Sequence, residues 1–342
     1  MVTSRDVAKL ANVSVSTVSR AFREDCYISE ELKKKVLDAA DKLGYTPNLV
    51  ARSLKNNRSG VIGLVLSDMD NVFYSIVSRV IESDLKKLGY RLIITYNNEN
   101  QEEELANLNL LAASRADGII FTPKSAKNHS LIKRLKKQNI SLVQMFRVGY
   151  PDIDSVLVDD EQGAYMATKH LVKNGHTDIL LLSVDYKIHL TFDSKTNEFC
   201  DPRSKGYKRA LLEEKILIRE SNIMHLPYHT DLKSMIIHKI KESKPTAIIA
   251  GTNIIAKDVI RACKEMKLTI PNDISLVMFD DVDWASLLDV TTISQPINEI
   301  GHIASRTILT QIENQNAKST PVHSTLEPVL ISRYSVKNLY AN

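Results

Sequence analysis

Four hydroxyl side chains and one arginine are gathered in a short stretch near the start of the chain: Ser14, Ser16, Thr17, Ser19 and Arg20. Hydroxyl groups can donate hydrogen bonds to phosphate oxygens, and an arginine can donate two parallel hydrogen bonds to a guanine. A helix face that only meets water would carry more glutamate and lysine. These residue types favour a DNA-reading surface, and a plain helical mini-domain stays open as the alternative on these residues alone.

The elements that must hold these side chains are two short helices joined by a tight link. Ser14 is a good N-cap, and apolar side chains recur behind it at helical spacing, namely Val15, Val18 and Phe22. Another helix is expected just upstream, over residues 4–10. Two short helices joined by a brief turn form a helix-turn-helix, whose second helix enters the DNA major groove.

A third helix is expected to complete a small apolar core. Ser29 is its expected cap and Gly44 its expected end. Its apolar stripe consists of Leu32, Val36, Ala40 and Leu43. We therefore predict an all-α domain over residues 1–46.

The excess positive charge of the chain lies on this N-terminal part. The chain has 342 residues and a formal net charge of +4, and its 43% apolar and 25% charged residues are ordinary for a globular protein. Residues 1–58 hold 11 Lys or Arg against 7 Asp or Glu, whereas the remaining chain holds 34 of each. A basic surplus confined to the helical part is what attraction to a phosphate backbone requires.

The cysteines and the apolar runs indicate where the protein works. Cys26, Cys200 and Cys263 are odd in number and widely spaced, which predicts neither a disulfide framework nor a metal site. We see no apolar run long enough to span a membrane and no hydrophobic secretory segment. We therefore expect a cytoplasmic protein with no metal, cofactor or membrane partner, which is associated with the nucleoid when it is bound to DNA.

A nearly continuous set of short motifs runs through the N-terminal stretch: Asp6-Val7-Ala8, Ala11-Asn12-Val13-Ser14, Thr17-Val18-Ser19-Arg20, Lys35-Val36, Leu43-Gly44-Tyr45-Thr46-Pro47-Asn48 and Ala51-Arg52-Ser53-Leu54. This set resembles the head of the lactose-repressor/galactose-repressor family of bacterial transcription regulators. The resemblance implies that Val15, Ser16 and Arg20 read bases. It also implies that Tyr45, Asn48 and the serines hold phosphates.

Residues 47–59 are expected to form a hinge helix and a linker. The helix is too short to be stable alone in water, and a flexible linker is the alternative. The resemblance implies that Leu54 wedges into the minor groove at the centre of the operator, while Ala51 beside it is small enough to allow close approach. An apolar wedge pries open one base step and lets the DNA bend.

From Val61 onward, short apolar strands alternate with helices, a pattern that predicts parallel sheets with helices on both faces. Strands are expected at 61–66, 91–96, 118–121, 141–145, 179–183, 247–250, 275–279 and 323–331. Helices are expected at 73–88, 102–113, 131–138, 163–174, 205–214, 232–243, 254–266 and 297–314. The two sets form two lobes of a periplasmic-binding-protein-like core over 60–342. We assign 60–160 and 292–322 to the first lobe, and 161–291 and 323–342 to the second.

The core carries no signature of catalysis. The loop after the first strand, Ser67-Asp68-Met69-Asp70-Asn71, lacks the glycines of a dinucleotide or P-loop site. We find no nucleophile elbow, and the nine histidines show no metal-ligand spacing. We therefore predict a binding protein rather than an enzyme, with no catalytic residue.

The core also resembles the same family, through motifs such as Ala116-Asp117-Gly118 and Thr291-Thr292-Ile293-Ser294-Gln295-Pro296. The resemblance implies an effector site in the cleft between the lobes, formed by Phe73, Tyr74, Arg147, Arg203, Asn253 and Asp280. Core packing for the aromatics, a surface position for Arg203 and a helix cap for Asp280 are the alternatives. The chain departs from the family pattern at Phe146 and at the pair Thr252-Asn253, which leaves the identity of the ligand open. The stretch 185–202 looks longer than usual and is expected to shape the pocket.

Taken together, these patterns predict a DNA-binding transcriptional regulator, most simply a repressor, acting as a homodimer on a palindromic operator. Its effector is expected to be a sugar or a sugar phosphate. Control by a phosphorylated partner protein is the alternative within the family. A solute-binding protein is disfavoured by the basic head.

Overall fold

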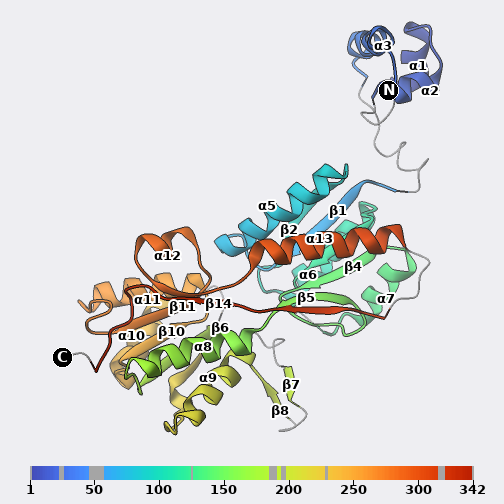
Figure 1. Cartoon of the computed structure of the whole chain (residues 1–342). Helices are drawn as coiled ribbons and strands as arrows, with labels where there is room; N and C mark the ends of the chain where they lie inside the picture. Colours follow the sequence, from blue (N-terminus) through green and yellow to red (C-terminus); the bar gives the residue numbers. More distant parts are fainter. Residues whose placement is uncertain are drawn as a thin grey trace. The chain divides into compact units, whose positions relative to one another are not determined.

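The computed structural model describes residues 2–22, 27–45, 58–124, 126–184, 191–193, 198–227, 230–314 and 320–340. The chain divides into two compact units, Met1–Ser59 and Gly60–Asn342. Each unit has its own apolar core, and each is described by itself (Figure 1). Among the described residues, no helix is both long enough and apolar enough to cross a membrane.

The first unit contains three helices, α1 (Ser4–Leu10), α2 (Val15–Ala21) and α3 (Glu30–Leu43). Each begins at a polar cap, because the first backbone N–H groups of a helix need outside acceptors. The carboxylate of Asp6 accepts hydrogen bonds from the backbone and hydroxyl of Thr3. Ser29 Oγ accepts from Leu32 N, and Gly44 ends α3 in the left-handed conformation that glycine adopts without strain. The expected helices and caps are therefore confirmed.

The core of the first unit consists of small side chains contributed by all three helices. Val7, Val18 and Val36 are fully or almost fully buried where the helices meet. Their spacing leaves the opposite face of α2 open to solvent. This packing fixes which side of α2 can meet a partner.

The second unit contains two six-stranded sheets. The alternating pattern predicted two mainly parallel sheets but fewer strands in each. The first sheet has the strand order β13-β5-β4-β3-β1-β2. Its strands are β1 (Val61–Leu66), β2 (Arg91–Tyr96), β3 (Gly118–Phe121), β4 (Ser141–Met145), β5 (Asp154–Val158) and β13 (His323–Leu326), all paired in parallel.

Four helices cover the two faces of the first sheet: α5 (Val72–Lys87), α6 (Gln101–Ala113), α7 (His129–Lys137) and α13 (Ile297–Glu313). The alternating side chains of β1 show the division, because Ile62 and Leu64 pack with α5 and α13, whereas Val65 packs with α6 and α7. A strand buried on both faces must be apolar throughout, which explains the continuous apolar run of β1.

The second sheet has the order β14-β12-β11-β10-β6-β9. Its strands are β6 (Ile179–Val184), β9 (Ile223–Leu226), β10 (Ala247–Ala250), β11 (Ser275–Phe279), β12 (Thr291–Ser294) and β14 (Val329–Ile331), of which β14 alone is antiparallel to its neighbour. α8 (Asp160–Lys173) and α9 (Pro202–Glu213) pack on one face, and α10 (Leu232–Ser243), α11 (Asn253–Glu265) and α12 (Asp283–Leu287) pack on the other. A short helix η1 (Glu220–Asn222) precedes β9.

Helices α8 and α9 approach closely because of one glycine. A Cβ atom at Gly206 would collide with the backbone carbonyl of Glu161 in α8. Any larger residue must therefore push the two helices apart. Beside them, β7 (Thr191–Asp193) and β8 (Glu198–Cys200) form a two-stranded antiparallel ladder within the long segment that precedes α9.

Several strands differ from the sequence-based expectation. The predicted strand 323–331 is split, because β13 pairs with β5 of the first sheet and only β14 joins the second, so its assignment to the second lobe alone was wrong. Residues 292–294, assigned to the first lobe, belong to β12 of the second sheet. The strands β5, β7, β8, β9 and β12 and the short helix α12 were not predicted at all. The chain thus crosses between lobes after β5, after β12 and between β13 and β14 (Figure 1).

Candidate functional site

A cleft lined by polar and aromatic side chains lies between the two lobes of the second unit. Its walls come from segments that follow the carboxyl ends of parallel strands, where open α/β sheets bind ligands. The lining residues are Asn71, Phe73, Tyr74, Phe146, Arg147, Val158, Asp160, Arg203, Thr252, Asp280 and Gln295. Both lobes contribute, so a bound molecule would contact each of them.

Aromatic rings form the wall of the first lobe. Phe73 and Tyr74 open α5, and their ring centroids lie 4.8 and 5.9 Å from that of Phe146. Phe146 has a positive φ of 64°, an unfavourable conformation for a bulky residue, which the surrounding packing must hold in place. Burial raises the pKa of Tyr74 to about 12, so its phenol stays protonated and can donate a hydrogen bond.

Beside these rings, Arg147 is held by a buried carboxylate. Glu99 accepts hydrogen bonds of 2.9 and 2.6 Å from the two terminal nitrogens of Arg147, and it pairs with Lys124 at 2.9 Å. The side chains of Arg147 and Glu99 are only 2% and 3% exposed. Burial alone would raise the pKa of Glu99, but the charges and hydrogen bonds of Arg147 and Lys124 outweigh it and lower that pKa to about 2.

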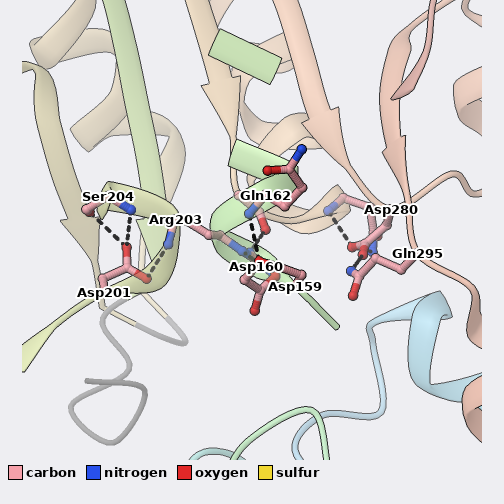
Figure 2. A network of polar contacts seen from close by, with 10 residues as sticks. Asp159, Asp160, Gln162, Asp201, Arg203, Ser204, Asp280 and Gln295 are labelled. Atoms are coloured by element: carbon pink, nitrogen blue, oxygen red, sulfur yellow. Dashed lines mark hydrogen bonds and ion pairs between the residues drawn. The ribbon is translucent and has the colours of Figure 1, made fainter. Parts of the chain in front are cut away.

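The wall of the second lobe is centred on Arg203, in the first turn of α9. Asp201 caps this helix by accepting hydrogen bonds from the backbone of Arg203 and Ser204 (Figure 2). The Arg203 side chain then points to the start of α8, where its Nε and Nη2 donate to Asp160 Oδ1 at 3.1 and 2.9 Å. Its Nη1 donates to the carbonyl of Gly251. Burial raises the pKa of Asp160, against the opposing effect of Arg203.

Asp280 follows β11 and is held by neutral donors. Its Oδ2 accepts from the backbone and side-chain amides of Asn253 at 3.0 and 2.8 Å, and its Oδ1 accepts from Gln295 at 2.7 Å (Figure 2). The residue has a φ of 74°, a conformation that aspartate tolerates better than most residues. A buried carboxylate fixed in this way offers its remaining lone pairs to hydroxyl or amine donors.

One hydrogen bond bridges the lobes beside the cleft. Asn253 Nδ2 donates to Asn71 Oδ1 at 2.6 Å, although the two residues belong to different lobes. Asn71 Oδ1 also accepts from Phe73 N and so caps α5. Both asparagines are buried. A change in the angle between the lobes would therefore act directly on the start of the aromatic helix.

The structure brings five of the six sequence-predicted effector residues to the cleft wall: Phe73, Tyr74, Arg147, Arg203 and Asp280. Asn253 has no exposed surface and lies behind Asp280, where it positions that carboxylate instead of lining the cleft.

Sequence reasoning missed Asp160, Gln295 and Asn71 as wall residues. Asp160 follows β5, so recognition of that strand would have pointed to it. Of the segment 185–202, only 191–193 and 198–202 are described, so its expected role at the pocket lies outside what the structure shows.

In the first unit, the hydroxyl-rich helix α2 has its predicted polar face in solvent. Ser14 Oγ accepts from Thr17 N at 3.1 Å, and its hydroxyl lies 2.7 Å from that of Ser16. Val15 is 44% exposed, and Ser19 and Arg20 are exposed too. Tyr45 packs edge-on against Phe22 and is half-buried. The other predicted DNA contacts, Asn48, Ala51 and Leu54, lie outside the described residues, as does the whole predicted hinge helix.

Metal chemistry gains no support from the part of the chain that the structure describes. It contains no group of three or more His, Cys, Asp or Glu side chains arranged to hold a metal ion. Cys263 is buried, and burial raises the pKa of its thiol to about 11, so the thiol is unreactive at neutral pH.

Comparison with known families gives two matches. Residues 3–48 match the family described as bacterial regulatory proteins, lacI family. Residues 168–336 match the periplasmic binding protein-like domain. The first match covers the three-helix unit, and the second covers most of the second lobe together with α13.

Individual proteins are similar to the chain over almost its whole length. Catabolite control protein A of Priestia megaterium is 32% identical over 326 residues, which cover 94% of this chain and 95% of that protein. A lac repressor dimer bound to operator and the anti-inducer ONPF has a TM-score of 0.77 at 24% identity, covering 98% of this chain and 99% of that one. The transcriptional regulator CelR in complex with cellobiose has a TM-score of 0.68 at 21% identity, covering 98% and 100%.

Proposed function

We propose that this chain, which belongs to the lacI family of bacterial regulatory proteins, is a cytoplasmic repressor. It binds a palindromic operator as a homodimer. It responds to a small carbohydrate that is held between the lobes of its second unit. As a family member it is a DNA-binding transcriptional regulator and not an enzyme. The observation that carries the effector proposal is the interlobe cleft, whose polar side chains stand at the carboxyl ends of strands from both sheets.

For DNA recognition, we assign base reading to the exposed side of α2. Val15 offers an apolar contact to a thymine methyl group, and Ser16 and Arg20 offer hydrogen bonds to base edges. The hydroxyls of Ser14, Thr17 and Ser19 suit phosphate oxygens. The packing of the unit supports these assignments, because it buries Val18 against the other helices and turns the named side chains outward.

Further DNA contacts are proposed along the chain that follows α3. Tyr45 and Asn48 hold phosphates, Leu54 enters the minor groove at the centre of the operator, and Ala51 allows the close approach that this requires. A dimer places one reading helix in each half-site, so the operator should be a palindrome. The likeness to a lac repressor dimer bound to operator supports this arrangement.

For the effector, the composition of the cleft supports a carbohydrate. Aromatic rings on one wall offer apolar faces to a sugar ring, and the carboxylates of Asp160 and Asp280 on the other accept hydrogen bonds from hydroxyl groups. The likeness to a regulator in complex with cellobiose supports the same class of ligand. Arg203 and Asp280 contact the ligand in this proposal, and Asn253 positions Asp280.

We propose that the effector site and the DNA-binding unit are coupled through the angle between the lobes. A ligand that touches both lobes favours one angle between them, and the Asn71–Asn253 hydrogen bond depends on that angle. Because a change in the core alters the spacing of two heads in a dimer, effector and operator must influence each other's affinity reciprocally.

Replacement of Arg20 by alanine tests the DNA-binding part. We expect the affinity for a specific operator to fall by about 1–3 kcal/mol at fixed salt, with binding to unrelated DNA changed little, because one bidentate base contact is worth that much. Fluorescence anisotropy with operator and scrambled duplexes measures both. Arg209→Ala, whose guanidinium pairs with Glu161 in the second unit, is the control. Unchanged discrimination in the Arg20 variant would remove α2 as the reading helix.

Replacement of Asp280 by alanine tests the effector part. We expect the variant to bind operator normally and to lose the shift in operator affinity that a panel of sugars produces in the parent protein. The control is Asp289→Ala, an exposed carboxylate outside the cleft wall. If Asp280→Ala responds like the parent, Asp280 does not contact the effector. If the parent itself answers to no small molecule and only to a phosphorylated protein, the carbohydrate proposal is wrong.

A further inference from the structure

The guanidinium of Arg203 is engaged on every side by the protein itself. One edge of the group donates to Asp160, and the nitrogen at its tip donates to the Gly251 carbonyl. Its plane stacks on the ring of Phe279, with the central carbon 4.1 Å from the ring centroid. The edge that an arginine would present to a phosphate is therefore already occupied by a carboxylate.

The other arginine of the cleft wall is neutralised in the same way. Both terminal nitrogens of Arg147 donate to Glu99, and Lys124 pairs with that carboxylate as well. The two arginines of the wall are thus each matched by a buried carboxylate. In the part of the chain that the structure describes, a third carboxylate, Asp280, accepts hydrogen bonds from the neutral amides of Asn253 and Gln295.

The charged groups described in the wall accordingly offer a ligand hydrogen-bond acceptors and no unneutralised positive charge. Among the described hydrogen bonds, Arg203 reaches only Oδ1 of Asp160, and no described donor reaches Oδ2. The pKa of Asp160 is raised mainly by burial, and the negative charge of Asp280 adds to this effect. A ligand that brings hydroxyl groups would meet these oxygens with the donors they lack.

We propose that Asp160 makes the cleft select uncharged, hydroxyl-rich ligands and reject phosphorylated or carboxylated ones. The proposal rests on the effector function proposed above and narrows its ligand class, since it favours the free sugar over the sugar phosphate. An anion seated on Arg203 would have to displace Asp160, leaving a buried carboxylate without its counter-charge, or lie beside both Asp160 and Asp280. Each arrangement places like charges together where solvent screening is weak.

Inorganic phosphate is the probe for the test, because its binding does not depend on which sugar the cleft holds. The key variant is Asp160→Asn, since an asparagine oxygen can still accept from Arg203 while the charge is gone. We expect the parent to show no saturable phosphate binding up to about 10 mM. The variant should gain affinity by about tenfold to a hundredfold, because the negative charge that neutralises Arg203 and repels phosphate is gone. Isothermal titration and ³¹P line broadening report the binding.

Two further variants test whether a gain in phosphate affinity arises in the cleft. Asp160→Asn with Arg203→Gln should lose the gain, because the guanidinium that attracts phosphate is absent. Asp178→Asn frees Arg219 from a matched Asp–Arg pair on the exposed surface, and it should show no saturable binding. The proposal would be overturned if the parent bound phosphate and Arg203→Gln abolished that binding. It would also be overturned if Asp160→Asn folded but gained no affinity for phosphate.

The parent protein supplies a second readout if Asp160→Asn fails to fold. Glucose with glucose 6-phosphate and ribose with ribose 5-phosphate are compared by thermal shift, and every pair that binds should favour the free sugar by at least about tenfold. A pair that favours the phosphate would contradict the proposal. If the chain has no carbohydrate effector at all, the outcome differs. The phosphate titrations would then give the expected results, but no compound would change the affinity for the operator.

Discussion

Removal of the Glu99 charge tests whether the buried ion pair behind the cleft stabilises the core. Glu99→Gln keeps the shape of the side chain but leaves the charges of Arg147 and Lys124 without their counter-ion in a site where Arg147 is 2% exposed. The pKa of Glu99 is lowered from 4.5 to about 2, and each pKa unit corresponds to about 1.4 kcal/mol of stability at neutral pH. We therefore expect Glu99→Gln to lower the free energy of unfolding by about 3 kcal/mol at pH 7.

The dependence on pH gives this prediction its sign. A carboxyl group with a lowered folded-state pKa stabilises the protein above its unfolded pKa, and that contribution is lost as the pH falls from about 4.5 towards 2. The difference between parent and Glu99→Gln should therefore shrink over this range, because a protonated glutamic acid resembles glutamine. Urea unfolding followed by circular dichroism at a series of pH values measures the difference.

Two comparisons make the Glu99 experiment decisive. Glu265 pairs with Lys233 at 2.7 Å on the exposed surface, and Glu265→Gln should leave the urea midpoint unchanged. Adding Arg147→Met to Glu99→Gln should recover part of the lost stability, since the unpaired buried charge is then gone. A loss below about 1 kcal/mol for Glu99→Gln at pH 7, or a loss that does not vary with pH, would refute the reasoning.

Three other changes have clear expected outcomes. Gly206→Ala forces α8 and α9 apart, so thermal melting should show that the free energy of unfolding falls by at least about 2 kcal/mol. Gly44→Ala is the comparison and should cost about 1 kcal/mol, because only the left-handed backbone conformation opposes a Cβ atom there. Val36→Ala removes a fully buried side chain from the small first unit and should cost about 2 kcal/mol there, seen as weaker operator binding with the melting of the core unchanged. Asn71→Ala removes a helix cap and the bridge between the lobes, so it should cost about 1 kcal/mol in core stability and weaken the response to effector.

The candidate site shows how far residue patterns alone reach. The resemblance pointed to Phe73, Arg147, Arg203 and Asp280 by their positions along the chain, which requires no knowledge of tertiary contacts. Asp160 escaped notice, since β5, the strand before it, is short and does not read as a strand by periodicity. Its role depends on Arg203, which lies 43 residues further along the chain. No local pattern reports a partnership at that separation.

The sequence by itself determined the elements whose cause is local. Ser14, Ser29 and Gly44 mark helix ends because capping depends on one side chain and its neighbours along the chain. The apolar run of β1 likewise indicates burial on both faces.

Only the tertiary structure decided how the lobes share their strands and which charges meet. The segment 323–331 contributes to both sheets because its two halves pair with β5 and β12, and such pairing depends on backbone partners far away in the chain. The compensation of Arg147 by Glu99 and of Arg203 by Asp160 is also a product of folding, because burial brings them together and gives their charges weight. That compensation, invisible in the order of residues, governs the chemistry that the cleft offers to a ligand.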